Sequence, residues 1–415
     1  MGELPPTAGL PLRFADIVAG YGGMLAARQK QLSFEQALAQ FLQIDEVDLY
    51  SSGSLCLSIA FETLRELTGR KRVILPGYTC PLVPIAAHLA GVEPVLCDTK
   101  VDSWQFDEKM LAQLCDSSIA AVVPTNIAGM PGNLTAVKQI AKASGAFVIE
   151  DAAQSLGAKL NGQAAGHAAD IAIYSLSAGK GLSLYDGGII AVRDRDLRQK
   201  IRAVAARRIS KQPLVNLLRN IQVLGLWLLY NPNGLPLVYG NELRHGLKDG
   251  DLVKAVGENF DFELSAYQYD ELRKRIGSSA LLRLPEFVRQ NRRRALKRSE
   301  ILAREGLRVL AEPEGAEGNW PFIMILLNSE QQRDEVMSRL WTAGLGVTRL
   351  FIHDLASYEY LRPIVPRQET PNAHSFAART FTITNSHWLS DEDFAGIVRT
   401  IKSVVADASL VGSGF

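Results

Sequence analysis

Short apolar runs alternate with amphipathic stretches from residue 48 to residue 192. The runs that read as buried strands are Val73–Leu75, Pro94–Cys97, Ala120–Pro124, Ala146–Ile149, Ile171–Leu176 and Gly188–Val192. Helical spacing predicts helices over residues 53–69 and 133–144 between them. Such alternation predicts an α/β fold with a mostly parallel sheet covered by helices on both faces. Ligands of such sheets bind at the carboxyl ends of the strands.

The last third of the chain predicts a second, smaller α/β unit. Its strands are expected at residues 322–327, 345–351 and 380–384, with helices at 330–343 and after Ser390. We therefore divide the chain into a large domain, residues 14–260, and a helical connector with a small C-terminal domain, residues 261–415. The ends, residues 1–12 and 409–415, are expected to be loosely held.

Residues 213–239 are rich in Leu, Trp and Tyr, and Arg219 is their only charged residue. They break at Asn231–Gly234, which is a turn signal. This stretch lies in a predicted hydrophobic insertion over about 209–256. A packing or subunit-contact role is favoured, and a hydrophobic wall for a substrate or a shallow membrane contact remains open.

Charge and composition exclude several classes of protein. The 415 residues carry 45 basic and 44 acidic side chains, a balance that indicates no nucleic-acid partner. No window reaches about 18 consecutive apolar residues, as a membrane span requires. The start of the chain lacks the pattern of a signal peptide. The four cysteines have neither metal-binding spacing nor the density of a disulfide framework, so we expect a cytoplasmic protein without a metal site.

An acidic residue, Asp151, stands at the carboxyl end of one predicted strand, in the run Val148–Gln154. A carboxylate in this place can keep a pyridinium nitrogen protonated, so that the ring withdraws electrons. A helix cap or a buried ion pair accounts for the same residue equally well.

A lysine, Lys180, follows the next predicted strand and lies between Gly179 and Gly181. Its neighbours have no bulk, so the amine can approach a ligand closely. A desolvated lysine can lose its proton and attack an aldehyde. A lone lysine is more often a surface residue, and this alternative stays open.

The third element is Ser52-Gly53-Ser54, at the start of a predicted helix. A helix N-terminus binds phosphate through backbone N–H groups and the helix dipole. An ordinary N-cap is the simpler interpretation of these three residues taken alone.

Together these elements resemble the DegT/DnrJ/EryC1/StrS family of PLP-dependent (sugar) aminotransferases, which have fold type I. The resemblance rests on motifs that occur in the family's order, namely Ser52-Gly53-Ser54, Leu75-Pro76-Gly77-Tyr78-Thr79, Glu150-Asp151-Ala152-Ala153-Gln154, Lys180 with Asp186-Gly187-Gly188, and Gly257-Glu258-Asn259-Phe260. It covers most of the chain. The fold it implies is a large domain with a mostly parallel seven-stranded sheet and a smaller C-terminal α/β domain.

The resemblance also implies roles for single residues. Lys180 carries pyridoxal 5'-phosphate (PLP) as a Schiff base and moves a proton, and Asp151 pairs with the pyridine nitrogen. Gln154 lies near the ring hydroxyl. Further cofactor contacts are expected from Gly53, Ser54, Tyr78 and Ser175, and Asn259 is expected to reach the phosphate of a neighbouring subunit. These roles imply a homodimer with shared active sites.

The sequence departs from the family at three places. Many members carry a ring-stacking aromatic residue at the position of Cys80, and Tyr78 or an aliphatic contact would have to replace it. Gly181 stands where Asn or His is common. The connector over residues 207–256 is longer than usual, which makes a less polar acceptor conceivable.

The expected activity is transfer of an amino group from an amino acid, Glu or Gln, to a keto group of a nucleotide-linked sugar. Another PLP reaction, such as elimination, decarboxylation or carbon–carbon bond formation on a less polar substrate, is the first alternative. A non-catalytic regulatory relative is the second. The sequence identifies neither the acceptor nor the position of amination.

Overall fold

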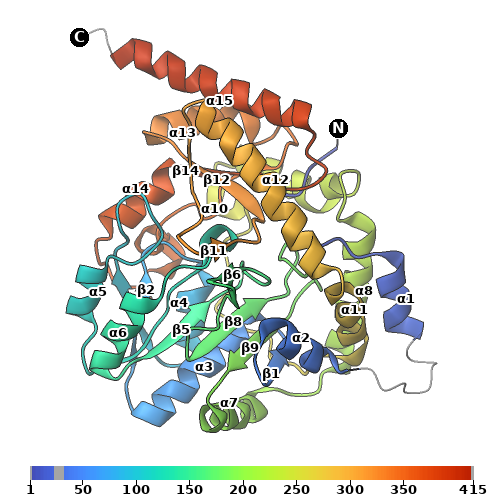
Figure 1. Ribbon diagram of the computed structural model, residues 1–415, viewed down its shortest axis with the longest axis vertical. Coiled ribbons are helices and arrows are strands. Elements are labelled where there is room, and N and C mark those ends of the chain that lie inside the picture. Colours follow the sequence, from blue (N-terminus) through green and yellow to red (C-terminus); the bar gives the residue numbers. More distant parts are fainter. Residues whose placement is uncertain (1, 23–31, 413–415) are drawn as a thin grey trace.

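The computed structural model describes residues 2–22 and 32–412, without the side chains of 408–412. A seven-stranded sheet forms its centre (Figure 1). In spatial order its strands are β1 (Val47–Tyr50), β9 (Gly188–Val192), β8 (Ile171–Ser175), β5 (Phe147–Asp151), β4 (Ile119–Val122), β2 (Arg72–Pro76) and β3 (Glu93–Cys97). Only β9 runs against the other strands, because it is antiparallel to both β1 and β8 while all remaining pairs are parallel. The predicted fold class is therefore confirmed.

Helices cover both faces of this sheet, as the continuous apolar strands require. Along β2, Val73 and Leu75 pack toward one face, whereas Ile74 packs toward the other. The first face is covered by α3 (Gly53–Thr68), α4 (Leu82–Leu89) and α7 (Arg195–Arg208). The second is covered by α5 (Glu108–Leu114) and α6 (Thr135–Ser144), with α2 (Phe34–Leu42) and α11 (Glu271–Leu281) nearer β9.

The two helices predicted inside the large domain are confirmed with their end signals. Helix α3 begins after Ser52, whose hydroxyl accepts a hydrogen bond from the Leu55 N–H at 3.0 Å. It ends at Gly69, which is left-handed with φ 73°. Helix α6 ends in the same manner at Gly145, with φ 70°.

A four-stranded sheet forms the small domain, in the order β10 (Arg308–Val309), β12 (Phe322–Leu326), β14 (Thr380–Thr384) and β13 (Val347–Thr348). Two of its predicted strands are confirmed, but the strand predicted over 345–351 is wrong in extent. Gly344 and Gly346 have φ of 74° and 67°, a left-handed backbone that cannot continue a strand. The chain then leaves the sheet after Thr348, and Arg349 lies buried.

The small domain also contains α13 (Glu330–Leu340), α14 (Pro371–Arg379) and α15 (Asp391–Gly412), with α12 (Leu284–Arg304) running from the large sheet to the small one (Figure 1). The short remaining elements are η1 (Ile127–Gly129), η2 (Pro236–Gly240), η3 (Leu355–Ser357), η4 (Glu359–Leu361), α10 (Leu252–Ala255), β6 (Lys159–Leu160), β7 (Gln163–Ala164) and β11 (Ala316–Glu317).

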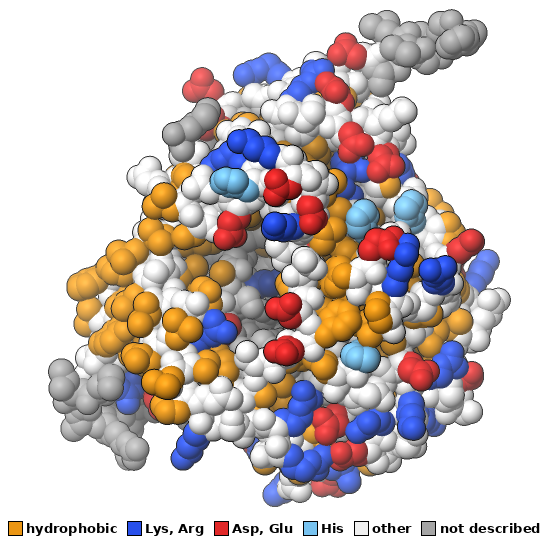
Figure 2. Space-filling model, turned by 180° about the vertical axis from the view of Figure 1, so that it is seen from behind, with side chains coloured by type: hydrophobic (Ala, Val, Ile, Leu, Met, Phe, Trp, Pro, Cys, Tyr) orange, Lys and Arg blue, Asp and Glu red, His pale blue; other side chains and the backbone are white. Residues whose placement is uncertain are grey.

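The predicted insertion forms α8 (Pro213–Leu229), a turn, η2 and α9 (Asn241–Lys248). One side of α8 packs inward through Val223, which is fully buried. The opposite side exposes 52% to 79% of Leu214, Leu217, Leu218, Ile221 and Leu228. Figure 2 shows a broad group of apolar side chains over the side of the molecule that carries α1 (Phe14–Gly22) and α8, next to a hollow. No helix among residues 2–22 and 32–412 has the length and apolarity to cross a bilayer.

The prediction of a loose N-terminal end is wrong for residues 2–12. Leu4, Ala8 and Leu10 are buried, with 8% or less of their surface exposed. Their backbone N–H groups donate to carbonyls far along the chain, for example Leu4 to Gly344 at 2.8 Å. Local composition carries no signal for such long-range contacts.

Gly188 provides a test of how closely β9 approaches the start of α3. A Cβ atom built on Gly188 would lie 2.4 Å from the carbonyl carbon and oxygen of Ser52. We expect Gly188→Ala to destabilise the protein by about 1–3 kcal/mol, because the backbone has to shift. Urea unfolding followed by circular dichroism measures this.

The matched control is Gly225→Ala, in α8, where a Cβ atom meets nothing within 4 Å. Alanine is favoured in helices by up to about 1 kcal/mol, so this variant should be neutral or slightly more stable. Equal stability of the two variants would contradict the close approach.

Candidate active site

Two neighbouring strands, β5 and β8, end together and carry the first site residues. Asp151 ends β5 and pairs in register with Ile173 of β8, which ends two residues later at Ser175. The Asp151 side chain is buried and accepts a hydrogen bond from the Ala153 N–H at 3.1 Å. Burial raises the pKa of Asp151, and the Ala153 N–H and the positive charge of Lys180 counteract this rise.

Lys180 lies in the tight loop that follows β8. Its N–H donates to the Ser177 carbonyl at 3.1 Å, and Gly179 before it has φ 79°, which favours glycine. A Cβ on Gly181 would lie 3.3 Å from the Leu156 carbonyl oxygen, so the loop passes close to its neighbours. The side chain of Lys180 is half-buried.

Cys80 belongs to the same region as Lys180 and Asp151. Burial raises the pKa of the Cys80 thiol to about 12, and the charges of Lys180 and Asp151 act on it in opposite directions. The charge of Lys180 also acts on Asp151. The structure thus brings together the lysine, the acid and the cysteine that stands in the place of the family's aromatic residue.

The start of α3 lies against the end of β8. A Cβ built on Gly53 would be 3.6 Å from the Cβ of Ser175, so the helix N-terminus and this serine are direct neighbours. The Ser175 hydroxyl accepts a hydrogen bond from the Ser177 N–H at 3.3 Å. Gly53 and Ser175 therefore lie together at the N-terminus of α3, and phosphate binding by these residues and Ser54 remains a prediction.

Gln154 and Tyr78, which are expected to contact the cofactor, contact other parts of the protein in this structure. The Gln154 side-chain oxygen accepts a hydrogen bond from the Ala128 N–H at 3.1 Å, which ties it to the segment after β4. The Tyr78 ring is buried edge-on against Phe351 and Phe376 of the small domain, with ring centroids 5.3 and 5.0 Å apart. Contact of Tyr78 with a cofactor ring remains a prediction.

Asn259 is exposed, whereas Glu258 beside it is buried. The Glu258 carboxylate accepts hydrogen bonds from the Tyr358 hydroxyl at 2.6 Å and the Ile352 N–H at 3.0 Å. Burial raises the pKa of Glu258 to about 7, although both donors oppose the rise. Its charge also acts on Cys80. Glu258 therefore joins the small-domain loop to the region of Lys180.

Three residues of this region, Glu258, Tyr358 and Asn319, have no role predicted from the sequence. The Asn319 side chain donates to the Leu156 carbonyl at 3.1 Å and lies 3.6 Å from the position of a Cβ on Gly181. Glu258 belongs to the motif Gly257-Glu258-Asn259-Phe260, so the sequence contains a signal that this residue lies near the site. Tyr358 and Asn319 lie in small-domain loops without periodicity. Only the fold brings Asn319 to the lysine loop and Tyr358 to Glu258.

The residues of this region fit PLP. Among the described residues, the Ala153 N–H is the one hydrogen-bond donor recorded for the buried Asp151 carboxylate, so the acid can accept a pyridinium N–H. The lysine amine and the helix start fit the aldehyde and the phosphate. The described residues include no group of His, Cys, Asp and Glu suited to a metal ion.

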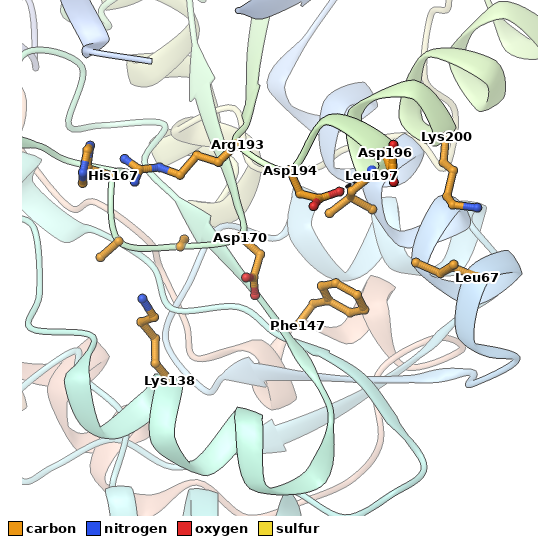
Figure 3. A pocket seen from close by; sticks show the side chains of 12 residues that line it. Leu67, Lys138, Phe147, His167, Asp170, Arg193, Asp194, Asp196, Leu197 and Lys200 are labelled. Carbon is orange, nitrogen blue, oxygen red and sulfur yellow. Dashed lines mark hydrogen bonds between the residues drawn. The ribbon is translucent and has the colours of Figure 1, made fainter. Parts of the chain in front are cut away.

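A hollow of about 520 Å³ lies where β5 and β8 begin (Figure 3). It is lined by Phe147 at the start of β5 and by Asp170 just before β8. His167 and Arg193 point toward one another across it, and Lys138 points toward them from α6 (Figure 3). Since Asp151 and Ser175 stand at the other ends of the same strands, this hollow is separate from the Lys180 region.

A protein-family model described as the DegT/DnrJ/EryC1/StrS aminotransferase family matches residues 19–225 and 243–402. The chain belongs to this family. The family consists of PLP-dependent aminotransferases, in agreement with the cofactor expected from the motifs. The unmatched residues between the two segments, 226–242, lie in the predicted insertion.

Protein MosB of Rhizobium meliloti is 31% identical over 172 residues, which are 41% of this chain and 34% of MosB. The chain thus spans about a third of the length of this relative. The putative sugar aminotransferase Spr1654 from Streptococcus pneumoniae, in its PMP form, has a TM-score of 0.74 at 18% identity, with 97% of this chain and 99% of that one covered. DesI in the presence of its TDP-sugar product has a TM-score of 0.74 at 20% identity, with 99% and 95% covered. These structures establish the fold.

The buried Glu258 makes stability depend on pH. Its pKa is about 7 in the folded protein against an ordinary 4.5, so the folded state holds a proton that the unfolded chain has lost. The free energy of unfolding should therefore fall as pH rises from about 5 to 7, by at most roughly 3 kcal/mol from this residue. In Glu258→Gln this fall should be smaller. Urea unfolding at pH 5, 6, 7 and 8 measures it.

The control is Glu263→Gln, which replaces an exposed carboxylate on the same segment. In this variant the free energy of unfolding should depend on pH as it does in the parent protein. Glu150 is also buried, with its pKa raised to about 7, so some dependence should persist in Glu258→Gln. An unchanged fall in Glu258→Gln would exclude the protonated state inferred for this carboxyl.

Proposed function

We propose that this protein is a PLP-dependent aminotransferase that moves an amino group from an amino acid to a keto group of a nucleotide-linked sugar. The observation that carries the proposal is the grouping of Lys180 with the buried Asp151 at the carboxyl ends of β5 and β8. PLP supplies an aldehyde that a lysine amine can attack and a ring that withdraws electrons from the substrate carbon.

Each residue of the site has a proposed task. The Lys180 amine binds the aldehyde and moves a proton to and from the substrate carbon. The Asp151 carboxylate keeps the proton on the ring nitrogen. Gly53, Ser54 and Ser175 hold the phosphate at the start of α3, and Gln154 lies near the ring hydroxyl. Cys80, on the side of Lys180 and Asp151, is a candidate to contact the ring in place of an aromatic residue.

The substrates are the finer part of the proposal. A TDP-sugar product of DesI, whose fold this chain shares, supports a nucleotide-linked sugar as acceptor. The PMP form of Spr1654 supports an amino group carried on the cofactor between donor and acceptor. We propose Glu or Gln as the donor, as the family resemblance implies.

We also propose a homodimer in which Asn259 reaches the phosphate of the other subunit. Asn259 is exposed, so it is available to a second copy. A cytoplasmic location belongs to the proposal as well, and the four unpaired cysteines support it.

Substitution of Lys180 tests the cofactor role. The PLP-loaded protein should show a visible absorbance band, and borohydride should fix the cofactor to Lys180, as peptide mass spectrometry detects. Lys180→Ala should lose the label and the activity, whereas Lys200→Ala, at an exposed position of α7, should keep both. A label on any other lysine would refute the assignment.

The donor reaction separates the proposed function from its alternatives. Mixing the PLP-loaded protein with L-glutamate or L-glutamine should bleach the band and yield a pyridoxamine species and the keto acid. A donor skeleton that keeps its nitrogen would favour elimination or another PLP reaction. Full biological activity of Lys180→Ala would favour a non-catalytic regulatory relative.

A further inference from the structure

The N-terminal segment, residues 2–10, runs as a strap between three parts of the molecule. The Glu3 N–H donates to the Pro232 carbonyl in the insertion at 2.8 Å. The Leu4 and Ala8 N–H groups donate to small-domain carbonyls, those of Gly344 at 2.8 Å and Pro321 at 2.7 Å. The strap is thus anchored along its length by backbone hydrogen bonds.

The end of the strap covers the loop that carries Lys180. The Thr7 hydroxyl donates to the Gly179 carbonyl at 2.8 Å, and the Leu10 N–H donates to the Gly181 carbonyl at 3.1 Å. A Cβ atom on Gly9 would lie 2.8 Å from the Lys180 carbonyl oxygen, so the two backbones are in direct contact. The carbonyls of three successive residues, 179 to 181, therefore face the strap.

The insertion holds Thr7 in place from the outer side. Tyr230, just after α8, donates its hydroxyl to the Thr7 carbonyl at 3.1 Å. Burial raises the pKa of Tyr230 to about 12, so it stays a donor at neutral pH. Arg219 in the same helix forms an ion pair with Asp186 at 2.8 Å, six residues beyond Lys180. The insertion thus contacts this loop at both ends, at Gly179 through Thr7 and at Asp186 directly, where Tyr267 and Arg273 also bind.

We propose that Thr7, held by Tyr230, is a positioning residue for Lys180. The inference rests on the proposed function, because it concerns the lysine assigned to the cofactor. The peptide between Gly179 and Lys180 is held at both of its polar groups, because its carbonyl accepts from the Thr7 hydroxyl at 2.8 Å and its N–H donates to the Ser177 carbonyl at 3.1 Å. Gly179 has a left-handed backbone, so local preference adds little to these two hydrogen bonds. Rotation of the peptide between residues 179 and 180 would redirect the Lys180 side chain.

Two observations distinguish this contact from ordinary packing. Tyr230 and Pro232 lie in residues 226–242, the stretch that the family model leaves unmatched, so the support lies outside the part of the chain that the family model describes. The hydroxyl of Thr7 also binds the residue next to the lysine rather than a distant surface. The insertion therefore serves the lysine loop directly.

The experiment compares Thr7→Val, which removes the donor and keeps the shape, with Thr7→Ser, which keeps the hydroxyl. The control is Thr68→Val, where a threonine hydroxyl also donates to a backbone carbonyl, that of Leu64 at 2.6 Å, but at the end of α3. In the PLP-free proteins, hydrogen exchange at residues 178–182 should speed up in Thr7→Val by about 3- to 10-fold, as loss of one hydrogen bond allows.

PLP affinity and the pH titration of the visible band give two further readouts. Thr7→Val should raise the Kd for PLP by about the same factor and shift the pH at which the visible band titrates. Tyr230→Phe should change both quantities in the same direction. Thr7→Ser and Thr68→Val should match the parent protein. Unchanged exchange and affinity in Thr7→Val, or failure of Thr7→Ser to restore them, would overturn the inference.

The two proposals fail separately in this design. If borohydride does not label Lys180 in the parent protein, the proposed function fails. If Lys180 is labelled in the parent protein while Thr7→Val behaves like Thr68→Val, only the positioning role fails.

Discussion

The site depends on one electrostatic arrangement, in which the positive charge of Lys180 acts on the buried carboxyl group of Asp151 at the end of the neighbouring strand. Burial alone would drive this carboxyl toward its neutral form, and the lysine counteracts that tendency. The parallel pairing of β5 and β8 makes the arrangement possible, because it brings the ends of both strands to one edge of the sheet. That edge is held in place by the helices, by the close packing of Gly188 against Ser52 and by the tight loop that carries Lys180.

Much of the fold follows from local patterns in the sequence. Apolar runs and glycine stops after helices predict six of the seven strands of the large sheet and the ends of α3 and α6, since these signals act within a few residues. Strand β1 is missed, because Asp48 interrupts its short apolar run. The strand predicted over 345–351 was too long because Gly344 and Gly346 adopt left-handed backbone that apolar content does not reveal. The N-terminal segment was misjudged because its partners lie more than 170 residues away.

The candidate site was predictable to the extent that motifs carry it. The charge of Lys180 acts on Asp151, and Gly53 lies beside Ser175, while the binding roles of these residues stay predictions. Glu258 and Tyr358 could not be assigned, because their contact spans 100 residues and depends on how the small-domain loop returns to the large sheet. For Tyr78 the motif predicts a contact with the cofactor, but the ring packs into the small domain beside Phe351 and Phe376.

The strap contacts the small domain and the lysine loop through residues that are neighbours in the chain. Ala8 is bound to Pro321, while Thr7 on one side and Leu10 on the other are bound to Gly179 and Gly181. A rotation of the small domain away from the sheet would therefore pull on the peptide that bears Lys180. The position of the small domain and the conformation of the loop that carries Lys180 are thus linked through residues 7–10 of one segment.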